Sequence, residues 1–212
     1  MTRLFNKFAE SIAGRIKSVE VVKNMIILLP TEFIVRGFLF ERTSVKNAYY
    51  LWRLIVPLFS PVLQGVALNY SKRISLDGRT QAYIRIDDVN DGVLQEMAET
   101  LIFEQVPNLS EIDSIQGFLS EFKDSGLDWR PNTKLDMAFA RLLCGELERG
   151  EQVIGEILQL SLDSPIVPLV QAEAKRLLEA SRQGPYALQQ LADEIREKNA
   201  SALFPGITLK EH

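Results

Sequence analysis

The spacing of apolar residues changes character near residue 88. In residues 66–76, apolar side chains occupy the even positions from Val66 to Leu76, interrupted only by Lys72, while the odd positions from Asn69 on are polar. A period of two is typical of a half-buried strand. After residue 88, apolar residues recur every three or four positions, which is typical of amphipathic helices. We therefore predict an α+β fold in which an antiparallel sheet precedes a bundle of helices.

Short apolar runs before residue 66 predict further strands at 24–30, 32–43 and 48–59. These runs are rich in Ile, Val and Phe and are too short for exposed helices. Pro57 is expected near a strand end, where its missing N–H donor is tolerated. With a strand at 66–76 and a returning strand at 79–87, residues 25–88 are predicted to form a sheet of four or five antiparallel strands.

The register of the last two strands determines the turn expected between them. A two-residue turn at Asp77-Gly78 would place apolar positions of one strand opposite polar positions of the other. A three-residue loop at 76–78 instead pairs Tyr70 with Ile84, so that the two apolar faces coincide. Gly78 then takes the left-handed position that such a loop needs. We predict the three-residue loop.

The longest uncharged run, residues 54–71, is predicted to be core and not a membrane span. It is shorter than the about 20 apolar residues that a spanning helix needs. Pro57 and Pro61 would each remove a backbone hydrogen bond from such a helix.

The first 23 residues are predicted to form an amphipathic helix. Its flanks are basic, and its apolar stripe consists of Leu4, Phe5, Phe8, Ile12, Ile16 and Val19. Such a helix could lie on an anionic membrane or cover one face of the sheet. We favour packing on the sheet, because an uncovered apolar sheet face is unfavourable.

Five or six helices are predicted after residue 88. Their expected boundaries are Pro107 as a stop, Ser110 with Asp113 as a capping box, Asn132 as a cap, Gly150 as a turn, and Pro165 and Pro185 as first helical residues. Short links between them indicate antiparallel neighbours. Their spacing does not fit a tetratricopeptide-like repeat, so we expect a non-repeating bundle.

Charge is distributed unevenly along the chain, although the net charge is only −4. Residues 1–88 carry 13 Lys and Arg against 7 Asp and Glu, whereas residues 89–212 carry 11 against 21. We predict a helix-and-sheet region at 1–88 and an acidic helical bundle at 89–212, which could also form one continuous domain. The split either gives each half its own solvated face or builds one face for a charged partner.

The inventory of reactive side chains disfavours common catalytic sites. The only histidine, His212, is the last residue, so a histidine base for a triad or a Cys-His pair is lacking. Cys144 follows Leu143 on an apolar stripe without a nearby cation and is expected to be a small core residue. No phosphate-cradling loop occurs, and we expect no cofactor. The single cysteine and the charged N-terminal segment favour a cytoplasmic location.

An acidic group, Asp87, Asp88 and Asp91, stands where the predicted sheet meets the helices. Its oxygens could hold Mg²⁺ or Ca²⁺, but it lacks the alternation and the closing glutamate of a calcium loop. Acids near a helix start are explained by the helix dipole. We therefore expect no bound metal. If a metal site exists, these three residues are the candidate ligands.

Arginines and aromatic residues are interleaved in the predicted strands. The candidates for binding a partner are Arg36, Arg42, Tyr50, Trp52, Arg53 and Arg73. Such side chains anchor protein interfaces, and on a sheet they can also stack nucleobases. They could instead pair with acids of the helical half. The overall pI near 5.2 disfavours a nucleic-acid surface.

These patterns favour a non-catalytic protein that binds another protein, such as an adaptor or an immunity-type protein that neutralises a partner. One alternative is a hydrolase or transferase that uses carboxylates or a metal held by Asp87, Asp88 and Asp91. Another is RNA or membrane-surface binding by the basic N-terminal half.

Overall fold

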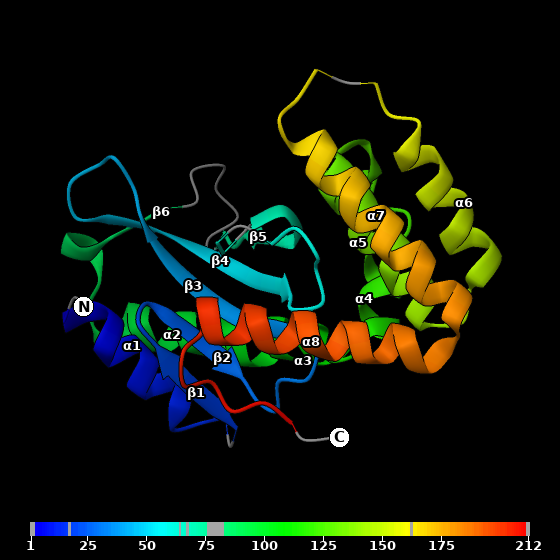
Figure 1. Cartoon of the computed structure of the whole chain (residues 1–212). Coiled ribbons are helices and arrows are strands. Elements are labelled where there is room, and N and C mark those ends of the chain that lie inside the picture. Colours follow the sequence, from blue (N-terminus) through cyan, green and yellow to red (C-terminus); the bar gives the residue numbers. More distant parts are fainter. Residues whose placement is uncertain are drawn as a thin grey trace. The chain divides into compact units, whose positions relative to one another are not determined.

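The computed structural model describes residues 3–16, 18–63, 65–66, 68–75, 83–161 and 163–210, apart from the side chains of Leu4, Ile86 and Asp128. An N-terminal helix, an antiparallel sheet and a C-terminal set of helices confirm the predicted α+β class (Figure 1).

The chain forms two compact units. The sheet unit consists of Met1–Val56, Tyr70–Glu111 and Ile207–His212, and the helical unit consists of Pro57–Asn69 and Ile112–Gly206. That residues 1–88 and 89–212 form separate domains stays a prediction.

The sheet has six strands, two of them very short. They are β1 (Val19–Val22), β2 (Met25–Leu28), β3 (Ile34–Arg42), β4 (Ala48–Pro57), β5 (Lys72–Arg73) and β6 (Tyr83–Arg85). The order is β1-β2-β3-β4-β5, and β6 also pairs with β4. Strands β2 to β4 lie where the apolar runs predict them, whereas β1 occupies residues predicted to be helical. Pro57 ends β4 as expected.

Helix α1 (Arg3–Ala13) packs its apolar stripe against the sheet, as predicted. The rings of Phe5 and Phe8 contact the ring of Phe40 in β3 edge to face, with centroids 5.5 and 4.8 Å apart. Phe5, Phe8 and Ile12 are buried. The phenylalanines of this helix are therefore core residues.

The predicted extension of this helix to residue 23 is wrong. The helix ends at Ala13, before Gly14, and Val19–Val22 forms β1 in antiparallel register with β2. The helical spacing of apolar residues continues across Gly14 by coincidence. The valines of β1 are β-branched, favour a strand, and pair with the buried β2.

The hairpin predicted over residues 66–87 is wrong in its pairing. Leu68–Tyr70 forms a 3-10 helix, and β6 pairs with β4 so that Ile84 lies opposite Tyr49 and not Tyr70. The alternation before residue 76 reflects burial of Tyr70 and Ile74, which irregular backbone also achieves. The loop predicted at 76–78 lies outside the described residues.

The uncharged run continues from β4 into the core of the helical unit. Phe59 is fully buried, and its ring contacts Phe118 and Phe139 at centroid distances of 5.4 and 6.0 Å. The Asn199 side-chain nitrogen donates to the carbonyl oxygens of Leu58 (2.7 Å) and Ser60 (2.9 Å). Residues 54–60, Val62 and Tyr70 are buried, as predicted for this run, whereas Gly65 is exposed. None of the described helices is long and apolar enough to cross a membrane.

Three helical segments complete the main part of the sheet unit. They are α2 (Asp91–Thr100), a π-helix η3 (Leu101–Gln105) and α3 (Val106–Ser110). Asn90 caps α2 by accepting from the Val93 N–H at 3.0 Å. Helices α1 and α2 lie side by side (Figure 1), joined by the ion pairs Lys7–Asp91 at 3.1 Å and Arg15–Glu99 at 3.5 Å.

The prediction that Pro107 ends the helix is wrong, because helical backbone continues through Ser110. The π-helix immediately before Pro107 changes the hydrogen bonding: the Val106 N–H donates to the Leu101 carbonyl, five residues back. Proline has no N–H to donate, so a widened turn at this point lets the helix continue past it.

From Ile112 to Gly206, the helical unit contains five α-helices and one short 3-10 helix among the described residues. They are α4 (Ile115–Phe122), η4 (Leu127–Trp129), α5 (Pro131–Leu143), α6 (Leu147–Leu158), α7 (Ile166–Gln183) and α8 (Pro185–Leu203). Consecutive helices from α4 to α8 pack as neighbours.

The helix boundaries predicted at Ser110, Asn132 and Gly150 are wrong, and Pro165 is the N-cap residue of α7 and not its first helical residue. Ser114, not Ser110, caps α4, since its hydroxyl accepts from the Gly117 N–H. Ser110 belongs to α3 and donates to the Val106 carbonyl. Asn132 lies inside α5, which begins at Pro131, a favoured first residue.

The predicted turn at Gly150 is the third error. The chain turns at Gly145, which has a φ of +82°, whereas Gly150 is buried inside α6. A Cβ at Gly150 would lie 2.5 Å from Leu142 Cδ2 and 3.2 Å from the Ala138 carbonyl oxygen. Glycine is needed here for close approach of α5 and α6 and not for a turn.

The end of the chain returns to the sheet unit. Thr31 and Leu209 form an isolated parallel bridge, and the Lys210 N–H donates to the Thr31 carbonyl at 2.8 Å. The Thr208 N–H donates to a Glu20 carboxylate oxygen at 3.3 Å. Residues 208–210 thereby contact both β1 and the segment that precedes β3.

Candidate functional site

Three of the predicted partner-binding residues meet at β4. Tyr50 and Trp52 are two positions apart in this strand and point to the same face. Arg73 of β5 lies opposite Trp52, and Tyr83 of β6 lies opposite Tyr50. Paired residues of an antiparallel ladder share a face, so all four side chains project from the same side of the sheet.

The Arg73 guanidinium lies over two aromatic rings. Its central carbon is 3.6 Å from the Tyr50 ring centroid and 4.8 Å from the Trp52 ring centroid. Both distances are within the range of a cation–π interaction, which contributes about 0.5–1 kcal/mol at an exposed site. Arg73 is exposed, whereas both rings are half-buried. We call Tyr50, Trp52 and Arg73 the stacked cluster.

Glu41 of β3 fixes the indole of Trp52. One of its carboxylate oxygens accepts a hydrogen bond from Trp52 Nε1 at 2.9 Å. The charged acceptor makes this a stronger bond than a neutral pair would form. It satisfies the only donor of the indole and holds the ring that Arg73 covers.

The other three predicted residues lie elsewhere. Arg36 and Arg53 are buried, at 5% and 9% exposure. Arg36 shares a strand face with Phe40 and therefore with α1, and one of its terminal nitrogens donates to the Pro30 carbonyl at 3.1 Å. Arg53 alternates with Trp52, so it lies on the face opposite to the stacked cluster. Arg42 is exposed at the end of β3.

Asp87 and Asp88 lie in a short 3-10 helix, η2 (Ile86–Asp88), and Asp91 is the first residue of α2; all three residues are exposed. Asp87 accepts a hydrogen bond from the Asn47 side chain at 3.5 Å, and Asp91 pairs with Lys7. Within the part of the chain that the structure describes, no three His, Cys, Asp or Glu side chains are grouped so that they could hold a metal ion.

Cys144 is half-buried at the C-terminal end of α5. Burial raises the pKa of its thiol, and the nearby Glu146 carboxylate raises the pKa further. A raised pKa lowers the fraction of thiolate, which is the nucleophilic form. The geometry does not activate this cysteine.

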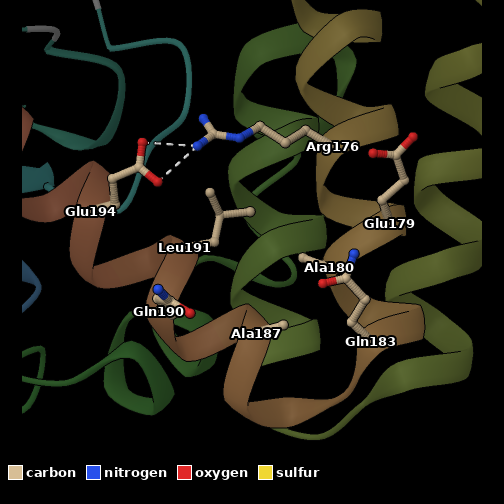
Figure 2. A pocket seen from close by; sticks show the side chains of 8 residues that line it. All are labelled: Arg176, Glu179, Ala180, Gln183, Ala187, Gln190, Leu191 and Glu194. Atoms are coloured by element: carbon tan, nitrogen blue, oxygen red, sulfur yellow. Dashed lines mark hydrogen bonds and ion pairs between the residues drawn. The ribbon is translucent and has the colours of Figure 1, made fainter.

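A shallow hollow of about 240 Å³ lies between α7 and α8 (Figure 2). It is lined by Arg176, Glu179, Ala180, Gln183, Ala187, Gln190, Leu191 and Glu194. Arg176 closes one end with two 2.9 Å hydrogen bonds to the Glu194 carboxylate. Both partners are exposed, so the pair is a weak surface bridge.

Two features of these sites were missed in the sequence. Glu41 and Tyr83 belong with the stacked cluster, and the alternation of β3 and β6 places each on a definite face once the strand pairing is known. The hollow between α7 and α8 has no motif of its own. Comparison with protein-family models, curated proteins and solved structures finds no match for this chain.

Proposed function

We propose that the protein is a non-catalytic, cytoplasmic protein that binds another protein through the stacked cluster of its sheet unit. Adaptor and immunity-type proteins are the two classes that fit such a role. The observation that carries the proposal is the stacked cluster itself: the guanidinium of an exposed arginine lies over the rings of a tyrosine and a tryptophan.

The composition of the cluster supports this role. Tyrosine, tryptophan and arginine are the residues most enriched at energetic hot spots of protein interfaces. Their rings offer large apolar area at low conformational cost, and the guanidinium adds directional donors. The Glu41–Trp52 hydrogen bond holds one ring in place before any partner binds, which reduces the entropy lost on binding.

Retention of a partner from native extract tests this proposal. Tagged wild-type protein, Arg73→Ala and Lys72→Ala are compared after nuclease treatment of the extract. Lys72 is the matched control, because it is an exposed cation of the same strand and its side chain points to the other face. We expect a protein that is retained by the wild type and by Lys72→Ala but is lost from Arg73→Ala.

Two results would contradict the proposal. One is a partner that all three proteins retain equally, since the stacked cluster would then not contribute. The other is a ligand that the wild type retains from untreated extract but not from nuclease-treated extract, since the bound molecule would then be a nucleic acid.

A further inference from the structure

The Arg73 side chain is exposed and can present N–H donors to a ligand. Within the described residues, the Arg73 side chain forms neither an ion pair nor a side-chain hydrogen bond, unlike Arg15, Arg141 and Arg176, which all pair with carboxylates. Its contacts are with the faces of two rings. The five N–H donors of a guanidinium lie in its plane, so stacking leaves them at the edge, where they can point outward.

A second cation lies on the same face of the sheet. Arg85 of β6 is exposed and lies opposite Ala48, while Arg73 lies opposite Trp52. Four residues of β4 separate these positions, which corresponds to about 13 Å along a strand. Glu41 is the acidic neighbour of the cluster, and its carboxylate already accepts from the indole of Trp52.

From this arrangement we infer that the cluster binds an acidic segment of the partner protein. A carboxylate of that segment pairs with the edge of the Arg73 guanidinium, and an apolar neighbour packs on Tyr50 and Trp52. A second carboxylate, about four residues away in an extended segment, is within reach of Arg85. This inference rests on the proposed function and names the chemistry of its partner.

The overall charge favours a protein segment over a nucleic acid. The chain carries a net charge of −4 and has a pI near 5.2, whereas a protein that binds nucleic acid ordinarily carries a net positive charge. A single carboxylate interacts chiefly with charges within a Debye length of about 8–10 Å. The nearby arginine therefore matters more to it than the net charge of the protein.

Tryptophan fluorescence gives a direct test, because the chain has only two tryptophans. In a Trp129→Phe background, emission reports on Trp52 alone. The probes are a capped peptide with two glutamates four residues apart and leucines between them, the same peptide with glutamines, and an oligothymidylate. We expect a saturable change with the glutamate peptide and binding that is roughly tenfold weaker with the glutamine peptide, since a carboxylate strengthens the contact with arginine.

Variants assign the effect to Arg73. Arg73→Gln should weaken binding of the glutamate peptide by roughly tenfold, while Lys72→Gln leaves it unchanged. In a Trp52→Phe background, Trp129 should not respond. Equal affinity for both peptides, no saturable response at millimolar peptide, affinity unchanged by Arg73→Gln, or tighter binding of the oligothymidylate would overturn the inference.

The peptide experiment can contradict this inference without contradicting the proposed function. If retention of a partner protein depends on Arg73 but the two peptides bind alike, the cluster binds a protein whose contact is not a carboxylate. If retention does not depend on Arg73, the proposed function itself is contradicted.

Discussion

The guanidinium carbon of Arg73 lies 3.6 Å from the centre of the Tyr50 ring, although the two residues belong to different strands. The ladder explains this contact, because Arg73 is paired with Trp52 and Tyr50 is the diagonal neighbour on the same face. Long side chains reach such diagonal positions. The stack is thus a product of strand pairing and not of local sequence.

Removal of Arg73 should change stability very little. The side chain is exposed and its ring contacts contribute about 1 kcal/mol or less, so Arg73→Ala should lower the free energy of unfolding by no more than that. Urea unfolding of Arg73→Ala beside Lys72→Ala measures the effect. A loss above about 2 kcal/mol would show that Arg73 mainly supports the fold, since surface substitutions usually stay within about 0.5 kcal/mol.

Gly150 and Gly155 form a matched pair within α6. A Cβ at Gly150 would lie within 2.7 Å of two Leu142 side-chain atoms, whereas a Cβ at Gly155 meets no atom within 4 Å. Leu142 is buried and cannot move aside freely. We expect Gly150→Ala to destabilise the protein by about 1–3 kcal/mol through overpacking.

Gly155→Ala should stabilise the protein by about 0.5–1 kcal/mol, because alanine is the better helix former. Thermal unfolding of both variants measures the difference. A neutral Gly150→Ala would contradict the close packing of α5 and α6.

Asn199 should be important for the helical unit. Its buried amide donates to the carbonyls of Leu58 and Ser60, and both would lose a partner in Asn199→Ala. Each unsatisfied buried acceptor costs about 1–3 kcal/mol, so the two together should cost about 2–6 kcal/mol. Lys198→Ala, one residue away and exposed, should change stability by less than about 0.5 kcal/mol. Equal values from chemical denaturation of the two variants would show that the two bonds are dispensable.

Cys144 should react slowly with thiol reagents. Burial and the Glu146 carboxylate raise the pKa of its thiol, so near neutral pH less thiolate forms than for a free cysteine. Alkylation by iodoacetamide should therefore be slower than for a small free thiol, and Glu146→Gln should speed it up. Glu148→Gln, at an exposed position in the first turn of α6, should not. A rate above that of the free thiol would identify an activated cysteine and reopen an enzymatic role.

Burial patterns in the sequence predict most elements but not their pairing. The stripe of α1 and the apolar runs of β2, β3 and β4 are local features, and each is found in the structure. The alternation around Tyr70 and Ile74 says that these side chains are buried. It does not say which strand lies beside Ile84, since register is a property of two segments.

Glycine and proline caused the errors in the helices for a related reason. A glycine suits both a turn and a close helix contact, so Gly145 and Gly150 cannot be told apart without the neighbouring helix. Pro107 should stop an α-helix, yet the π-helix before it allows helical backbone to continue. A π-helix or a close helix contact depends on the backbone around the residue. Neither changes the spacing of apolar residues in the sequence.

The residue types of the candidate site were predictable from the sequence. Which of these residues lie on the same face of the sheet was not. Arg36, Arg53 and Arg73 look alike in the sequence, since each lies in or next to an apolar, aromatic strand. Strand alternation separates Arg53 from Trp52, and only the contact of Phe40 with α1 shows which face the helix covers. The stack required knowledge of the β4–β5 register.

The affinity of the retained partner for wild-type protein, Arg73→Ala and Lys72→Ala, measured by isothermal titration calorimetry, tests the central claim most directly. A stacked arginine at the centre of an interface should contribute at least about 1.4 kcal/mol, so Arg73→Ala should weaken binding by at least about tenfold. Lys72→Ala should stay within about twofold of the wild type. Equal affinities for all three proteins would contradict the account.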